Sequence, residues 1–265
     1  MVSFSNYTYE PSLGSRPGAG KPLVEDADVG HVLLNKLRQM RVDIAWLQQE
    51  TRQTGHHGAG RVVNADFFSA NEPLEADTVD LMLTSPPYMN NYHYVRNTRP
   101  QLYWLNFVSS PREHRYLESN NFGQYWQTVR NAESMALAFE HQHLEGIVRQ
   151  LRQTCADKGA YGGPGWANYV TTYFNDCFRF TSVLKRVLAH GGVGVVVIGN
   201  SIIQGMNIET ENILGEIGQM QGLMLQGVHC IREKRVGASI TQSSVRRGKQ
   251  SPATLSEFAV ILRKR

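Results

Sequence analysis

The fold expected for this chain depends on one stretch of sequence, Asp80-Leu81-Met82-Leu83-Thr84-Ser85-Pro86-Pro87-Tyr88. Together with Val79, which precedes it, this stretch begins with a nearly continuous apolar run from residue 79 to residue 84. Such a run is typical of a strand buried on both faces of a parallel sheet. The run ends in two prolines, which fix their own φ angles and carry no N–H. Because active sites of open α/β sheets lie beyond the carboxyl ends of strands, we expect a functional site at residues 84–88.

The side chains of this turn suit the binding of an amino group on a flat ring. Ser85 carries a hydroxyl that can donate to or accept from an exocyclic amine. The carbonyls near Pro86 and Pro87 can face a ligand, and Tyr88 offers a ring for base stacking, worth about 1–3 kcal/mol per base. An isolated Ser-Pro-Pro is more often a plain turn, but its place directly after an apolar strand favours a site.

The rest of the sequence predicts an α/β sheet covered on both faces. Residues 1–27 are predicted to be an extended arm, and residues 28–265 a catalytic domain with a partly helical insertion at about 89–165. Apolar spacing predicts helices at about 28–50, 166–189 and 209–221, and strands at 61–65, 79–84, 194–199, 223–231 and 258–262.

Composition bounds the class of protein. Hydrophobic residues make up 41% and charged residues 19%, as in ordinary globular proteins. No apolar stretch approaches the roughly 20 residues of a membrane helix, and the first residues lack the pattern of a signal peptide, so a cytoplasmic location is expected. The three cysteines have no metal-ligand spacing. A net charge of +4 is compatible with a polyanionic partner but does not require one.

Residues 80–88 resemble the catalytic motif of DNA amino-methyltransferases that use S-adenosylmethionine, which takes forms such as (Asp/Asn/Ser)-Pro-Pro-(Tyr/Phe). The resemblance continues at residues 91–96, 99–105 and 197–205, and spans most of residues 60–265. It implies a partial Rossmann-like methyltransferase sheet and methyl transfer to an amine of a flipped DNA base. Ser at the first motif position is more typical of cytosine-N4 enzymes, with adenine N6 as the alternative. No cysteine follows a proline as in carbon-5 cytosine methyltransferases.

The resemblance also assigns roles to single residues. It implies that Ser85 positions the target amine, that Pro86 and Pro87 supply the backbone carbonyl region, and that Tyr88 stacks on the base. It places Asp66, with Thr84, at the cofactor. Asp66 is equally consistent with a turn residue or a helix cap.

Two further residues and several cations complete the predicted site. Asn200 and Ser201 either line the pocket or cap the end of a strand. DNA contacts are predicted for Arg96 and Arg99, which lie among aromatic residues, and for three cations of a loop at about 234–256: Arg246, Arg247 and Lys249. The alternative for all five is a solvated, mobile surface.

One expected part of such an enzyme is missing from the sequence. The resembled family binds its cofactor with a Phe-x-Gly-x-Gly loop after the first strand, and no good copy occurs here. The glycine-rich stretches at 14–20, 159–165 and 191–194 do not follow an apolar strand. We therefore expect the first strands and the cofactor loop to come from a second polypeptide. One alternative is a catalytically silent DNA-recognition subunit. A less favoured alternative is an RNA or protein amino-methyltransferase, because the motif in those enzymes is usually Asn-Pro-Pro-Tyr rather than Ser-Pro-Pro-Tyr.

Overall fold

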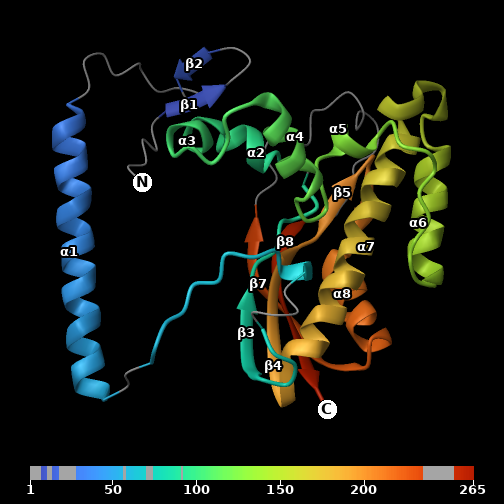
Figure 1. Ribbon diagram of the computed structural model, residues 1–265. Coiled ribbons are helices and arrows are strands. Elements are labelled where there is room, and N and C mark those ends of the chain that lie inside the picture. The colour runs from blue at the N-terminus through green and yellow to red at the C-terminus, as the bar shows by residue number, and fades with distance from the viewer. Residues whose placement is uncertain are drawn as a thin grey trace. The chain divides into compact units, whose positions relative to one another are not determined.

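The computed structural model describes residues 7–10, 14–17, 28–55, 58–69, 74–90, 92–234 and 254–265 (Figure 1). The chain divides into two compact units. One comprises Met1–Asn64 and Arg96–Leu102, and the other comprises Ala65–Val95 and Tyr103–Arg265.

The first unit contains a small strand pair and one long helix. Strands β1 (Tyr7–Glu10) and β2 (Gly14–Pro17) pair antiparallel, within the segment predicted to be an extended arm. Helix α1 (Val29–Thr54) begins where the Asp28 carboxylate accepts the His31 N–H at 2.8 Å, and it ends at Gly55, whose φ is 67°. The predicted helix at 28–50 is confirmed and extends one turn further.

The predicted strand at 61–65 is wrong. Residues 58–66 form no strand, and η1 (Phe67–Ser69) follows them. The apolar run there is short, and the Val62 side chain is 96% exposed, so nothing packs on it to stabilise an extended conformation. The Asp66 carboxylate instead accepts the Phe68 N–H and the Ser69 hydroxyl, which stabilises the turn.

The second unit is built on a mixed four-stranded sheet, which confirms the α/β prediction. Its strand order is β3 (Val79–Thr84), β4 (Leu188–Gly199), β8 (Leu255–Lys264) and β7 (Leu223–Lys234). Strands β3 and β4 are parallel, and the other pairs are antiparallel. Strand β4 begins earlier than the predicted residue 194, directly after the long helix that precedes it. Strands β5 (Ser201–Ile203) and β6 (Met206–Ile208) form a hairpin beyond β4.

Helices account for most of the remaining residues. Short helices occupy the predicted insertion: α2 (Tyr94–Asn97), α3 (Arg99–Trp104), α4 (Pro111–Ser119), α5 (Trp126–Val129), α6 (Gln142–Gln153) and η2 (Ala156–Tyr161). Helix α7 (Gly163–Val187) and helix α8 (Thr210–Met220) confirm the two later helix predictions. No helix in the described part of the chain combines the length and hydropathy needed to cross a bilayer.

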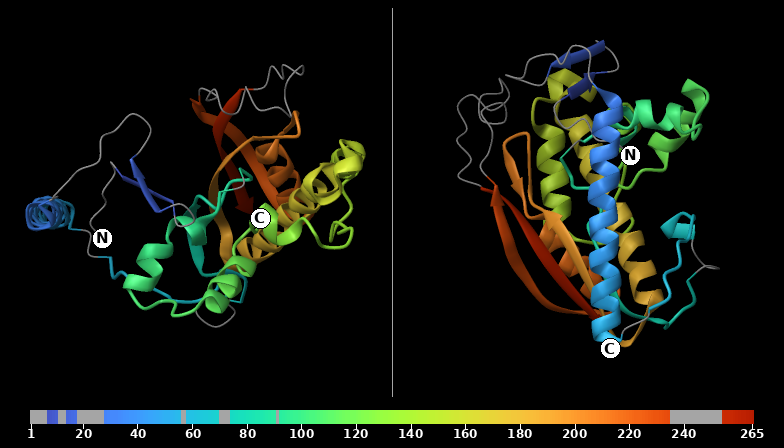
Figure 2. Two further views of the ribbon diagram at one scale, coloured as in Figure 1. Left: turned by 90° about the horizontal axis from the view of Figure 1, so that it is seen from above. Right: turned by 90° about the vertical axis from the view of Figure 1, so that its left-hand side faces the viewer.

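Within this unit, α7 and α8 pack on one face of the sheet (Figures 1 and 2). A Cβ at Gly194 would lie 2.9 Å from the Leu184 side chain of α7, so residue 194 of β4 faces that helix. Because side chains alternate along a strand, Val193 and Val195 point to the opposite face. They pair in register with Leu81 and Leu83 of β3.

The apolar run of β3 predicts a strand that is buried on both faces, and this prediction is wrong. Strand β3 lies at the edge of the sheet, and the side chains of Leu81 and Leu83 are 63% and 72% exposed. Met82 packs against the core. The apolar run reflects one face that α7 and α8 cover and a second face that they do not.

The packing of α7 on β4 gives a test of the core. Leu184→Ala should lower the free energy of unfolding by about 2–5 kcal/mol, because the side chain is fully buried and its removal leaves a cavity beside Gly194. Urea denaturation followed by circular dichroism measures the change. The control is Met220→Ala on α8, whose side chain is 49% exposed and whose effect should stay within about 0.5 kcal/mol. Equal effects of the two substitutions would contradict this packing.

Candidate functional site

The turn after β3 brings Ser85 and Tyr88 together. The Ser85 hydroxyl donates to the Tyr88 hydroxyl at 3.4 Å. The Tyr88 ring lies against the end of β4, where a Cβ at Gly199 would be 3.2 Å from ring atom Cδ2 and 3.3 Å from the Ser256 carbonyl oxygen. Glycine at 199 therefore gives the ring its space.

Backbone carbonyls of the turn are held from two other elements. The Tyr173 hydroxyl, on α7, donates to the Pro87 carbonyl oxygen at 2.9 Å. The Ser201 hydroxyl, at the start of β5, donates to the Met89 carbonyl oxygen at 2.6 Å. Sequence patterns did not single out Tyr173, because it is far from the turn in sequence and belongs to the apolar face of a helix.

The two residues after β4 help to fix the end of that strand. The Asn200 side-chain amide donates to the Thr254 carbonyl at 2.8 Å, and its oxygen accepts the Ser256 N–H at 2.8 Å. Asn200 thus ties β4 to the start of β8, which agrees with the strand-end alternative. Ser201 is 4% exposed, and its hydroxyl binds the backbone of the turn at Met89, so it holds the turn from the buried side.

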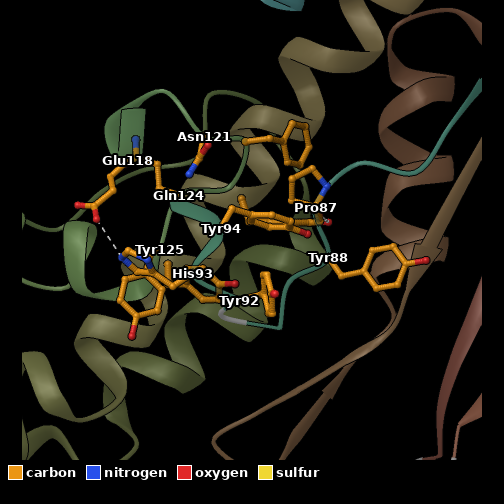
Figure 3. Close-up of a pocket in the computed structure, with 12 residues that line it drawn as sticks. Pro87, Tyr88, Tyr92, His93, Tyr94, Glu118, Asn121, Gln124 and Tyr125 are labelled. Carbon is orange, nitrogen blue, oxygen red and sulfur yellow. Dashed lines mark hydrogen bonds and ion pairs between the residues drawn. The ribbon is translucent and has the colours of Figure 1, made fainter. Parts of the chain in front are cut away.

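A pocket lies beside the turn, lined by Pro87 and by an aromatic cluster (Figure 3). In the close-up, Tyr88 points away from the other labelled rings. The lining residues on the far side of Pro87 include Tyr92, His93, Tyr94, Glu118 and Tyr125. The rings of Tyr92 and Tyr94 meet edge to face, with centroids 4.8 Å apart. The free space between these side chains is about 10 Å³, roughly that of one water molecule, so in this conformation the rings pack on one another and leave no room for a base.

His93 and Glu118 form the polar pair of this pocket. The His93 Nε2 atom lies 3.1 Å from Glu118 Oε1, and the imidazole meets the Tyr125 ring edge to face at 4.1 Å. Burial lowers the pKa of His93, and the Glu118 charge opposes that shift only in part. At neutral pH the imidazole is therefore neutral and donates its Nε2–H to the carboxylate.

The residues predicted to contact a cofactor have local roles in the structure. Both carboxylate oxygens of Asp66 accept hydrogen bonds from the η1 turn, as its turn-residue alternative requires. Thr84 is the last residue of β3 and pairs with Val196 of β4. Neither observation tests the cofactor contacts, which stay predictions.

The glycines at 162–165 serve packing between helices. A Cβ at Gly162, Gly163 or Gly165 would lie within about 2 Å of a backbone carbonyl oxygen, at Cys155, Leu151 and Ala160 respectively. Such close approach between chain segments leaves no room there for a phosphate or a nucleoside. This stretch is therefore not the missing cofactor loop.

The predicted DNA-contacting cations lie in parts of the chain other than the unit that holds the turn, or outside the described residues. Arg96 and Arg99, on α2 and α3, belong to the first unit, whereas the turn belongs to the second. Arg246, Arg247 and Lys249 lie outside the described residues. Their roles remain predictions.

Comparison with known proteins gives matches only among solved structures. No family model matches the chain, and no curated protein matches it. A crystal structure of a proposed DNA modification methylase from Thermus thermophilus aligns with a TM-score of 0.38 and 12% identity, over 78% of this chain and 54% of that chain. A second structure of that protein, complexed with S-adenosyl-L-methionine, aligns with a TM-score of 0.37 and 12% identity, over 76% and 53%. This chain spans about half the length of those structures.

The polar pair in the aromatic pocket gives a titration test. Glu118→Gln should lower the pKa of His93 further, because burial still disfavours the imidazolium and the attracting carboxylate is gone. A histidine NMR titration measures the shift, with Glu145→Gln on α6 as the control. An unchanged or higher pKa in Glu118→Gln would contradict the pairing.

Proposed function

We propose that this chain transfers a methyl group from S-adenosylmethionine to an exocyclic amine of a flipped DNA base, with cytosine N4 as the favoured acceptor. The observation that carries the proposal is the Ser85-Pro86-Pro87-Tyr88 turn at the carboxyl end of β3, with Ser85 and Tyr88 in contact and the backbone held from α7 and β5. The resemblance of this motif to DNA amino-methyltransferases supports the assignment. A cytoplasmic location belongs to the same proposal.

The turn has the groups that such a reaction needs. The Pro87 carbonyl is engaged by Tyr173, so the Ser85 hydroxyl and the Pro86 carbonyl are the proposed acceptors for the amine hydrogens. Tyr88 provides the stacking face for the base. Extrusion of the base costs a few kcal/mol, which stacking on Tyr88 and hydrogen bonds at the turn offset. Acceptors placed at the amine stabilise positive charge as it develops, so no covalent intermediate is needed.

S-Adenosylmethionine supplies the electrophilic methyl when it is bound. Each Asp66 carboxylate oxygen uses one lone pair in the η1 turn and keeps another, so Asp66 can still accept from a cofactor beside Thr84. Asp66 and Thr84 could therefore form one part of a cofactor site, but they do not form a complete one. In the described residues, the glycines at 162–165 are committed to packing and those at 191–194 lie within β4.

Two alternatives follow from particular features. Adenine N6 is the second choice of acceptor, because the same turn geometry can hold either amine and only Ser85 favours cytosine. A DNA-recognition subunit without catalysis is the second choice of function, because the cofactor site is incomplete. In each case DNA is the partner, and the proposed phosphate contacts are Arg96, Arg99, Arg246, Arg247 and Lys249.

A second polypeptide completes the site in this proposal. Strand β3 is the edge of the sheet among the described strands, and it exposes Leu81 and Leu83 without a proline or lysine to discourage pairing. The proposed partner adds a parallel strand to this edge and covers the two leucines with apolar side chains. A glycine-rich loop after that strand would then lie beside Thr84, at the carboxyl edge of the sheet.

Methyl transfer to DNA tests the function. The chain is incubated with labelled S-adenosylmethionine and unmethylated DNA, with and without the product of an adjacent gene that carries Phe-x-Gly-x-Gly, and the nucleosides are analysed. We expect N4-methylcytosine, and Tyr88→Ala should abolish most transfer because the stacking face is lost. Tyr116→Ala is the matched control, since that ring is 69% exposed on α4.

Two outcomes would count against this assignment. A folded Tyr88→Ala protein with near-normal activity would refute the role of the turn. N6-methyladenine as the sole product would reverse the choice of base and leave the reaction class in place.

The partner is tested by binding. Calorimetry should show weak binding of S-adenosylmethionine to this chain alone and tight binding when the partner is present, because each would stabilise the assembled site. Leu83→Asp should weaken the complex by placing a charge in an apolar contact. Met220→Asp, exposed on α8 at the opposite face, should leave the complex intact. Tight cofactor binding and turnover by the chain alone would refute the two-chain proposal.

A further inference from the structure

We infer that the buried hydroxyls of Tyr173 and Ser201 act together as a clamp that fixes the orientation of Tyr88. Tyr88 lies between the two carbonyls that the clamp holds, those of Pro87 and Met89. Tyr173 and Ser201 are therefore positioning residues for the candidate site. The effect of the clamp on catalysis rests on the proposed function, whereas its effect on the conformation of Tyr88 does not.

The carbonyls of the turn need hydrogen-bond donors from other elements, because the turn has few N–H groups of its own. Pro86 and Pro87 contribute no N–H groups, so nearby carbonyls have fewer local partners than in an ordinary turn. Inside the turn, the Tyr88 carbonyl accepts the Asn90 N–H at 2.8 Å. The carbonyls on either side of it are satisfied by side chains that enter from α7 and β5. The Tyr173 bond therefore satisfies the carbonyl that is joined to the Tyr88 nitrogen, and the Ser201 bond satisfies the next carbonyl after that of Tyr88.

The Tyr173 hydroxyl is aimed by rigid packing around its ring. Tyr173 is 1% exposed, and the Phe122 ring meets it edge to face with centroids 5.4 Å apart. At Gly123, where φ is 70°, a Cβ would lie 2.4 Å from the Tyr173 Cδ2 atom, so the loop backbone lies directly on the ring. The Gly123 N–H donates to the Asp176 carboxylate at 2.8 Å, which ties this loop to α7. Burial raises the pKa of Tyr173 well above its usual value, so the hydroxyl stays protonated and keeps its role as a donor.

Ser201 is anchored just as firmly from the other side. It follows Asn200, whose side chain is bound to the backbone at Thr254 and Ser256. Its acceptor belongs to Met89, whose side chain is fully buried. With Gly199 against its ring, Tyr88 is then constrained by β4 at the side chain and by the two hydroxyls at the backbone. A ring held in this way is already placed before a base arrives, which is the arrangement that favours catalysis by positioning.

The conformational part of the inference is tested with a probe on the ring. 3-Fluorotyrosine is placed at position 88 of the full chain, and its ¹⁹F spectrum is recorded for the wild-type background, Tyr173→Phe and Ser201→Ala. We expect one narrow resonance in the first and a broadened, shifted or split resonance in each variant, because one flanking carbonyl loses its donor. Thr181→Val is the matched control: its buried hydroxyl donates to carbonyls of α7 itself, at Cys177 and Phe178. Its spectrum should match the wild type.

The catalytic part is tested with methyl transfer to unmethylated bacteriophage λ DNA in the presence of the partner, using the same substitutions with tyrosine at position 88. Each clamp variant should lose roughly 10- to 100-fold in kcat with little change in KM for DNA. A ¹⁹F spectrum unchanged in both variants would overturn the clamp, and so would losses confined to KM. Altered spectra with no methyl transfer by the wild-type protein would instead refute the proposed function and support the conformational role. If Tyr173→Phe fails to fold, Ser201→Ala decides the question by itself.

Discussion

The parallel pairing of β3 with β4 is the constraint on which the candidate site depends. In a parallel pair both carboxyl ends lie at the same edge, so the turn after Thr84 and the residues after Gly199 meet in space although they are far apart in sequence. The Tyr88 ring against Gly199 and the Ser201 hydroxyl on the Met89 carbonyl both follow from this register. A shift of β3 by one residue would turn Met82 out of the core and move the turn away from Ser201.

Helix α7 links this pairing to the rest of the unit. Near its end, Leu184 packs on Gly194 of β4 and places the helix close to the sheet. Further back along the same helix, Tyr173 reaches the Pro87 carbonyl and Asp176 holds the loop at Gly123. The helix that builds the core therefore also aims a hydroxyl at the turn, so core packing and site geometry are coupled through one rigid element.

Periodicity in the sequence predicts most of the second unit, because apolar spacing follows from burial on a helix face or in a sheet. The strands at 79–84 and 194–199, the helices that became α7 and α8, and the last two strands are all confirmed. The strand at 61–65 fails because a short apolar run needs tertiary contacts that Val62 does not receive. The exposure of Leu81 and Leu83 could not be predicted either, because the residue type alone does not show whether another part of the structure covers the side chain. The motif marks Ser85 and Tyr88 as candidate site residues, whereas the contact of Tyr173 with Pro87 depends on the way α7 packs in the fold, which no local sequence pattern predicts.

The position of β8 has a consequence for the order in which the protein forms. Strand β8 lies between β4 and β7, although it follows both in the sequence. During synthesis, β4 and β7 therefore emerge with no strand to bridge them, and the apolar faces of both wait for residues 255–264. The hairpin of β7 with β8 can close locally, but the sheet as a whole can form only when β8 inserts beside β4. A ribosome-bound chain that stops before β8 leaves β4 and β7 without the strand that joins them, so the closing of the sheet comes after both strands have been synthesised.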